Sequence, residues 1–238
     1  MKPDYGIDAP RLLRALLIGG ALLLLGALVL PDDVSARRPL GLVGLAILGL
    51  AAVRLYGSRL GKLRVRDQIV DSLRLSGRER VLDLGCGRGL LMIGVAKRLT
   101  SGRAIGVDLW RKQDLLHNDP TEVLYNARAE RVDERVELHT EDMRKLPFED
   151  GSFDVVVSSW ALHCVPGALE QRKVLEEAVR VLRPGGMFLL VDVSTPGMAA
   201  EALAHLGMVD VTLSGPSFLF VQPSRRVTAR KPLASSQR

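Results

Sequence analysis

The chain has 238 residues, of which 47% are hydrophobic and 25% are charged, and its formal net charge is +6. This length allows one α/β domain and a further segment, and the composition excludes a disordered chain. The basic excess lies near the N-terminus and in the C-terminal tail. It therefore fits the flanks of a membrane segment better than a nucleic-acid surface, and we expect no nucleic-acid partner.

The two cysteines, Cys86 and Cys164, lie far apart in the sequence, and neither belongs to a C-x-x-C pattern or a Cys/His cluster. Metal sites and disulfide frameworks need such groupings. We therefore predict no metal site and no disulfide framework.

Two apolar runs follow a short N-terminal segment, residues 1–11. The first run, Ala15–Leu30, contains no charged residue, and flanking arginines that snorkel extend it to roughly the 20 residues that a bilayer needs. A polar turn at 31–39 separates it from the second run, 40–53. We predict a transmembrane helical hairpin over residues 12–56.

Lysine and arginine gather before the first run and after the second, and no acidic residue follows the second run until Asp67. The positive-inside rule therefore places both ends of the hairpin in the cytoplasm. The chain would then be a multi-pass protein of the cell membrane whose following domain is cytoplasmic. The sequence does not indicate the oligomeric state.

Two other interpretations of the first run stay open. Arg11 and Arg14 precede an apolar core, and Val34-Ser-Ala36 is similar to a signal-peptide cleavage site. The second apolar run argues against simple secretion. An amphipathic surface helix is the other alternative, but the first run is apolar on all sides.

A strand, a glycine turn and a helix follow an amphipathic helix predicted over 61–75. The sequence Val81-Leu-Asp-Leu-Gly-Cys-Gly-Arg-Gly89 opens as a buried strand, and residues 90–99 have helical apolar spacing. Glycine lets a ligand lie against the backbone at such a turn. The start of the helix offers unpaired N–H groups to an electron-rich group.

The spacing of the glycines separates this turn from a dinucleotide site. Its third glycine, Gly89, comes one residue earlier than in the G-x-G-x-x-G fingerprint. Asp83 would repel a pyrophosphate, whereas a carboxylate suits an ammonium group. Asp108 ends the next predicted strand, 104–108, where its two oxygens can accept from both hydroxyls of a ribose.

The rest of the chain continues the alternation of strands and helices. Trp110–Thr121, a polar stretch that includes Gln113, His117 and Asn118, is either a surface loop or a substrate contact. The further predicted elements are a helix at 122–131, strands at 136–140 and 152–158, a helix at 169–182 ended by Arg183–Gly186, a strand at 187–193, a helix at 199–206, strands at 209–213 and 218–221, and a disordered basic tail at 223–238.

Four separated features together resemble class I S-adenosylmethionine (SAM) methyltransferases: D-x-G-x-G-x-G at 83–89, Asp108 after the second strand, Asp142 after the third, and Leu-Arg-Pro-Gly-Gly at 182–186. The resemblance covers Gly61–Val221 and is nearest to the group related to quinone-biosynthesis methyltransferases. It implies an α/β fold in domain 61–222, with a Rossmann-like seven-stranded sheet of order 3-2-1-4-5-7-6. The last strand in sequence, strand seven, would be antiparallel.

The resemblance also implies the cofactor, SAM, and a methyl acceptor that is a small molecule or a lipid. Asp142 would accept from the adenine amino group and Met143 would pack on the ring. The residues assigned to the cofactor are Asp83, Gly85, Cys86, Gly87, Gly89, Asp108, Leu109, Asp142, Met143 and Ser158.

The acceptor side is less defined. His163 follows the fourth strand and is a candidate general base, or else a structural histidine. A base need not exist, because the sulfonium already activates the methyl group and positioning is the main task. Ser158–Ala161 lacks the N/D/S-P-P-Y/F signature, which argues against methylation of DNA bases. A membrane-tethered SAM-binding module without catalysis and a protein methyltransferase are the alternatives.

Overall fold

The computed structural model describes residues 2–7, 9–111, 118–217 and 223–233. The chain divides into two compact units, which are described separately. The smaller contains Gly6–Arg64, and the larger combines Met1–Tyr5 with Val65–Phe218 and the C-terminal segment from Gln222.

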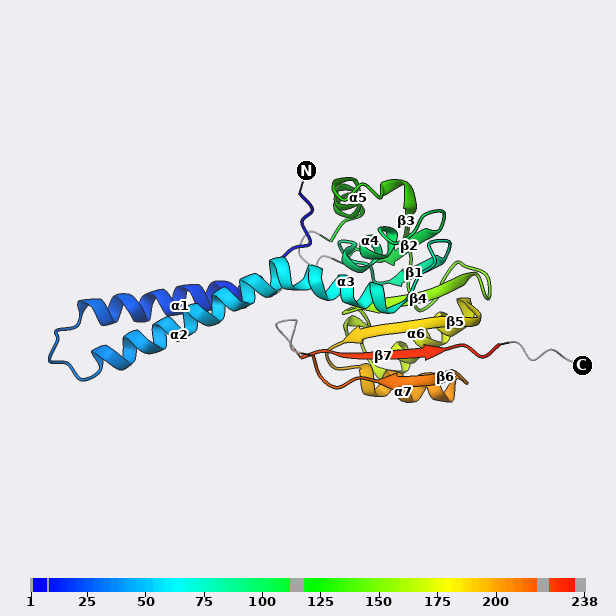
Figure 1. Cartoon of the computed structure of the whole chain (residues 1–238). Helices are drawn as coiled ribbons and strands as arrows, with labels where there is room; N and C mark the ends of the chain where they lie inside the picture. The colour runs from blue at the N-terminus through cyan, green and yellow to red at the C-terminus, as the bar shows by residue number, and fades with distance from the viewer. Residues whose placement is uncertain (1, 8, 112–117, 218–222, 234–238) are drawn as a thin grey trace, which may run out of the picture. The chain divides into compact units, whose positions relative to one another are not determined.

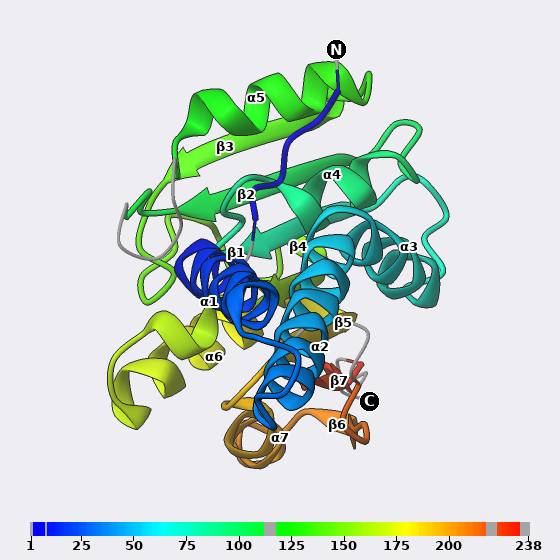
Figure 2. The same cartoon turned by 90° about the vertical axis from the view of Figure 1, so that its left-hand side faces the viewer.

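The smaller unit is a helical hairpin. Helices α1 (Pro10–Val29) and α2 (Arg37–Tyr56) lie side by side and run antiparallel (Figures 1 and 2). A Cβ atom added at Gly20 would lie 2.8 Å from Leu48 Cγ and 3.1 Å from the carbonyl oxygen of Gly44. Glycine at these two positions therefore lets the helix backbones approach closely, as small residues do between membrane helices.

Both helices are long and apolar enough to cross a membrane. The candidate spans are Pro10–Val29 and the apolar part of the helical run Arg37–Ser72, and only 17% of each apolar window is buried. A core helix of a soluble protein would be mostly buried, whereas a signal sequence near the N-terminus passes the same test of length and composition. The run Arg37–Ser72 passes through a π-helical turn, η1 (Gly57–Gly61), before α3 (Lys62–Ser72).

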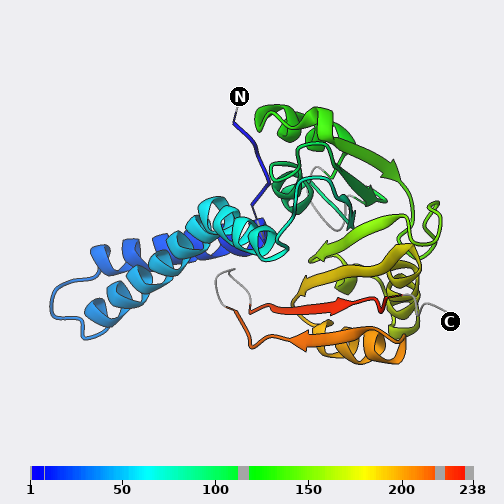
Figure 3. The same ribbon diagram turned by 45° about the vertical axis from the view of Figure 1, so that its right-hand side comes forward.

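A mixed β-sheet organises the larger unit. Seven strands of the described residues form it, in the order β3-β2-β1-β4-β5-β7-β6. β7 is antiparallel to both neighbours, and the other pairs are parallel (Figure 3). This confirms the predicted strand order. The strands are β1 (Arg80–Leu84), β2 (Arg103–Asp108), β3 (Val136–Thr140), β4 (Phe153–Ser159), β5 (Leu182–Asp192), β6 (Val209–Leu213) and β7 (Arg225–Arg230).

Helices cover both faces of this sheet. Gly106 of β2 faces Met92 of α4, whereas its neighbours Ile105 and Val107 belong to a core cluster with residues of α6 and α7. Side chains at alternate positions of the strand thus pack against helices on opposite faces of the sheet. Besides α3, the helices of this unit are α4 (Leu90–Ala96), α5 (Pro120–Ala129), α6 (Ala168–Val181) and α7 (Pro196–His205), with short 3₁₀ turns η2 (Asp133–Arg135) and η3 (Leu162–Cys164).

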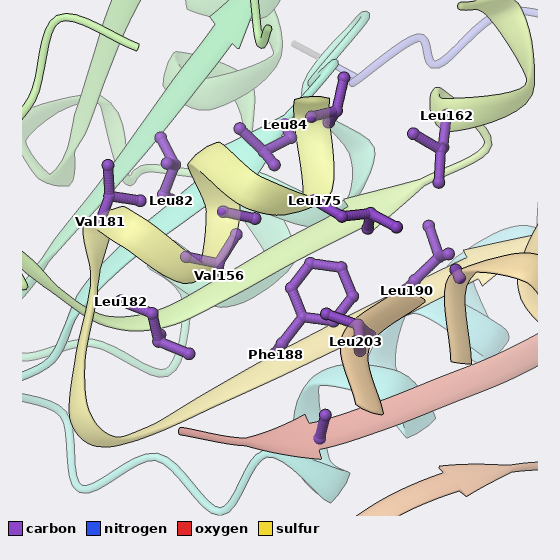
Figure 4. Close-up of a cluster of buried hydrophobic side chains, with 14 of the residues drawn as sticks. Leu82, Leu84, Val156, Leu162, Leu175, Val181, Leu182, Phe188, Leu190 and Leu203 are labelled. Atoms are coloured by element: carbon purple, nitrogen blue, oxygen red, sulfur yellow. The ribbon is translucent and has the colours of Figure 1, made fainter. Parts of the chain in front are cut away.

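The core between the sheet and the α6–α7 layer is apolar. Figure 4 shows Phe188 of β5 in this cluster, with Leu175 of α6 and Leu203 of α7. All three side chains are at most 1% exposed. Burial on this scale, about 1.5–3 kcal/mol for each large side chain, fixes the strands whose carboxyl ends carry the site.

The C-terminal end of the sheet differs from the prediction. Residues 225–230, assigned to a disordered tail at 223–238, form β7, and the strand predicted at 218–221 lies outside the described residues. Val227 and Ala229 are at most 1% exposed, and they alternate with Arg226, Thr228 and Arg230, which are half-buried or exposed. Two small apolar residues at alternating positions are enough for a strand buried on one face. The strand was not predicted because basic residues dominate the composition of this segment.

The start of β5 also differs. The Arg183–Gly186 segment, predicted as a turn that ends α6, is included in the strand. Leu182 pairs with Phe153, whereas the next pair is Val155 with Met187. Four residues are therefore bulged out of the ladder, so the Pro-Gly-Gly sequence interrupts the pairing without ending the strand.

We predict that Val227→Ala lowers the free energy of unfolding by about 2 kcal/mol, because two buried methyl groups are lost. Arg230→Ala, three residues along the same strand and exposed, should change it by less than about 0.5 kcal/mol. Chemical denaturation of the full chain in detergent measures both. Equal effects of the two changes would contradict the assignment of 225–230 to the sheet.

Candidate functional site

The glycine turn after β1 brings the predicted cofactor residues together at the carboxyl edge of the sheet. Gly85, Gly87 and Gly89 have φ angles of 69°, 51° and 81°. These values favour glycine, because side chains rarely tolerate them. A Cβ atom at Gly85 would lie 2.2 Å from the Cβ of Ala161, so the loop after β4 packs directly against this turn.

Asp108 is tied to the same turn. Its Oδ2 accepts from the backbone N–H of Gly87 at 2.8 Å. Its Oδ1 accepts from the backbone N–H of Trp110 at 2.7 Å and from Asn118 Nδ2 at 3.1 Å. Three donors thus fix the carboxylate in position; Oδ1 accepts two of these bonds and Oδ2 only one, so Oδ2 keeps a lone pair for a ligand hydroxyl.

Asp83 lies beneath the turn and is only 2% exposed. Burial, with the nearby charge of Asp108, raises the pKa of its carboxyl to about 8, opposed by a backbone hydrogen bond from Met92. Its Oδ1 has no hydrogen-bond partner among the described residues. A buried carboxyl oxygen without a donor is a ready acceptor for a ligand ammonium group.

The apolar residues assigned to the cofactor also lie at this edge. Met143 Cε is 3.8 Å from the position that a Cβ at Gly85 would occupy, and Leu109 is 39% exposed directly after β2. Cys86 is buried, and burial raises the pKa of its thiol well above the ordinary value. Its sulfur lies 2.8 Å from the position of a Cβ at Gly106, so it packs against β2 as a neutral thiol.

Two predicted residues make strong bonds within the protein itself. Asp142 forms a bidentate ion pair with Arg144, with Nη2 2.6 Å from Oδ2, and this guanidinium keeps the pKa of the Asp142 carboxyl low. Ser158 is buried, and its hydroxyl donates to the carbonyl oxygen of Leu84 at 2.9 Å. Asp142 is thus shared with Arg144, and Ser158 joins β4 to the end of β1.

His163 forms an ion pair with Asp192 that the sequence did not reveal. Its Nδ1 lies 2.7 Å from Asp192 Oδ1, and its backbone N–H donates to Oδ2 at 3.1 Å. Side-chain hydrogen bonds of the ring with Asp192 and with Cys164 raise the pKa of His163 to about 10, and burial opposes them. Asp192 ends β5 as Asp108 ends β2, and this shared position is the signal that would have identified it.

Both tryptophans of the chain lie close to the carboxyl ends of strands. Trp110 is two residues after β2 and Trp160 directly follows β4, with φ angles of 56° and 53°. Bulky residues seldom adopt this conformation, and it gathers at binding sites. Gln113 and His117, from the same polar stretch as Trp110, lie outside the described residues.

Arg88 of the glycine turn points toward a network on the N-terminal strap, which we define as residues 4–5. Asn126 of α5 is fully buried and donates through Nδ2 to the carbonyl oxygens of both Asp4 and Arg88, each at 3.0 Å. The Arg88 guanidinium pairs with Glu122 at 2.5 Å and Asp4 at 3.4 Å. The turn is therefore supported by α5 and by the strap.

The donors and acceptors fit a molecule with an ammonium group, a ribose and an adenine. Asp83 offers an unpaired acceptor, Asp108 a fixed one at the end of the next strand, and Leu109 and Met143 offer apolar surface. No group of three or more potential metal ligands occurs among the described residues. These groups together fit SAM. A turn that binds a pyrophosphate would have no carboxylate such as Asp83 for the ammonium group of SAM.

The sheet order is that of the class I methyltransferase fold. Residues 82–190, which make up less than half of the chain, match the family model described as a methyltransferase domain. This match supports S-adenosyl-L-methionine as the cofactor.

Several known proteins resemble this chain. It is 36% identical over 144 residues to 27-O-demethylrifamycin SV methyltransferase of Amycolatopsis mediterranei (58% of this chain, 49% of that protein). It is 33% identical over 133 residues to demethylmenaquinone methyltransferase of Lactobacillus johnsonii (55% and 50%). The chain thus spans about half the length of these relatives. A crystal structure of a SAM-dependent methyltransferase from Aquifex aeolicus superposes with a TM-score of 0.52, at 18% identity over 69% of this chain and 88% of that chain.

We predict that Asp83→Asn removes a loss of stability that the cofactor-free wild-type protein undergoes as the pH rises. The folded-state pKa of about 8 exceeds the ordinary 3.8, so the native state keeps a proton that the unfolded state releases. The free energy of unfolding of the wild type therefore falls between about pH 4 and pH 8, and this part of the decline should vanish in the variant. Denaturation curves across this range measure it. Parallel pH profiles for the two proteins would contradict the protonated, buried state.

Proposed function

We propose that this protein transfers the methyl group of SAM to a small lipophilic acceptor at the cytoplasmic face of the cell membrane. The observation that carries the proposal is the arrangement around Asp108, whose carboxylate is fixed by Gly87 and Asn118 beside the unpaired Asp83. Relatives named for demethylmenaquinone and 27-O-demethylrifamycin SV support a small-molecule acceptor.

The protein's part in this reaction is mainly positioning. When bound, SAM supplies a methyl group that its sulfonium already activates. Asp83 binds the ammonium group, Asp108 accepts from the ribose hydroxyls, and Leu109 and Met143 pack against the adenine. These contacts fix the direction from which an acceptor must approach, and orientation alone supplies a large part of such a rate enhancement.

The acceptor would approach from the side of β4 and β5. Ala161 packs against Gly85, and His163 follows two residues later, so η3 lies beside the end of the glycine turn. Trp160 adds an aromatic side chain to the same loop. An aromatic ring and a histidine suit a flat, lipophilic molecule with a polar reacting group.

The helical hairpin supports the membrane location. The apolar faces of α1 and α2 are exposed along their length, and more basic residues flank the open end of the hairpin than the turn, which has Arg37 and Arg38. Contiguous exposed apolar surface of this kind marks a membrane or a partner. With both ends cytoplasmic, the domain would have access to the cytosolic pool of SAM and to lipophilic acceptors in the bilayer.

Asp108→Ala tests the cofactor site. We expect it to weaken SAM by about 1–3 kcal/mol through lost hydrogen bonds, measured by calorimetry on the full chain in detergent. Asp133→Ala, an exposed aspartate in η2, is the matched control and should leave the affinity unchanged. Wild-type protein should also transfer labelled methyl from SAM into a lipid extract. Binding without transfer would favour a SAM-binding module, and transfer into protein alone would favour a protein methyltransferase.

Membrane fractions test the hairpin. The full chain should stay with membranes after a carbonate wash, because two spans bury far more apolar surface than a peripheral contact. A chain in which Leu22 and Leu45, both exposed at the middle of the helices, are replaced by Arg should be released or degraded. Recovery of the unmodified protein in the soluble fraction would refute a membrane-spanning hairpin.

A further inference from the structure

We propose that His163, held by Asp192, binds the acceptor as an anion through Nε2, so that the substrate is an acidic hydroxyl compound such as a phenol, an enol or a carboxylic acid. This inference rests on the proposed function and specifies the acceptor class. It also gives His163 a role different from the general base that its position alone suggests.

The geometry of the pair fixes which ring nitrogen is available. Asp192 is fully buried, and its Oδ1 accepts from the backbone N–H of Val193 at 2.6 Å in addition to its 2.7 Å contact with His163 Nδ1. Its Oδ2 accepts from the backbone N–H of His163 at 3.1 Å. An ionised carboxylate only accepts, so Nδ1 carries a proton and Nε2 is the ring nitrogen that Asp192 does not occupy.

The pair lies where an acceptor must bind. η3 follows β4, whose last residue, Ser159, is in register with Val191 of β5, and Asp192 comes next. Ala161 of the same loop packs against Gly85 of the glycine turn. The His163 side chain is 34% exposed, whereas Asp192 is 0% exposed. The imidazole is therefore the accessible member of the pair, one strand away from the cofactor turn.

The charge of the imidazole follows from its surroundings. The groups that act on it are Asp192 of β5, through a hydrogen bond and its charge, and Cys164 of η3; burial opposes them. Asp192 is 0% exposed and lies 2.7 Å from the ring, and a buried negative charge favours a positively charged partner. The pKa of His163 is accordingly raised above the ordinary 6.5, which favours the imidazolium at neutral pH. An imidazolium has no lone pair with which to remove a proton, but it attracts and hydrogen-bonds an anion.

This charge selects the chemistry of the acceptor. An acidic hydroxyl loses its proton to solvent and meets the imidazolium as an oxygen anion. An oxygen lone pair then forms the new O–C bond while the S–C bond breaks, and the electron pair of that bond stays on sulfur, which becomes a neutral thioether. An amine gains nothing from this site, because it is protonated or needs a base that His163 does not provide.

The experiment uses 4-nitrophenol as a probe on the full chain in detergent, saturated with S-adenosylhomocysteine. Calorimetry first establishes that S-adenosylhomocysteine binds. If it does not bind, the proposed function is refuted independently of the further inference. Absorbance of the phenolate then gives the pKa of the bound probe. We expect it to fall by about one unit, which is about tenfold tighter binding of the phenolate than of the phenol. 4-Nitroaniline, of similar shape but without an acidic hydroxyl, should bind at least about tenfold more weakly than the phenolate.

Two variants and one spectrum complete the test. Asp192→Asn and His163→Gln should abolish the shift in the pKa of the probe. In the wild type, the NMR signals of the labelled His163 ring, assigned with the His163→Gln variant, should remain those of an imidazolium well above pH 6.5. A midpoint at or below 6.5 in the wild type overturns the proposal. An unchanged pKa of the probe, or no binding of it, also overturns the proposal and leaves the pair a structural contact.

Discussion

The hydrogen bond between the Gly87 N–H and the Asp108 carboxylate is the contact on which the site depends. It joins the turn after β1 to the end of β2, so the carboxylate that we assign to the ribose and the glycine turn cannot move independently. Glycine is required in that turn, because φ is positive at Gly85, Gly87 and Gly89. Asp83, buried below it, adds a carboxyl whose raised pKa is a cost to stability that a ligand ammonium group can offset.

Three other acids show how context sets the role of a carboxylate. Asp142 is neutralised by Arg144, Asp192 by His163, and Glu130 by Arg66 and Lys97. Asp83 differs from these because no cation lies beside it among the described residues, and its Oδ1 has no partner. A buried carboxyl at the cofactor turn with no cation beside it indicates where a cationic group binds.

The resemblance to class I methyltransferases predicted the strand order. The meeting of Asp83 with Asp108 was predicted because the carboxyl ends of neighbouring parallel strands share one edge. Contacts between residues far apart in the chain could not be predicted. Asp4 and Asn126 are 122 positions apart and meet only because α5 folds beside the strap. The pairing of His163 with Asp192 depends in the same way on the register of β4 and β5. β7 was missed because its apolar residues, Val227 and Ala229, are small and surrounded by arginine.

The strap of residues 4–5 has a practical consequence for work on the domain alone. Asp4 and Tyr5 precede the hairpin in sequence, yet they bond to Asn126 and Glu130 of the catalytic unit. A shortened chain that starts after the apolar helices for the sake of solubility would lose these bonds, and would leave the buried amide of Asn126 without one of its acceptors. A fusion that keeps residues 2–7 and joins them by a flexible linker to α3 would retain this support, so the catalytic unit is better obtained by excising the hairpin than by truncating the chain.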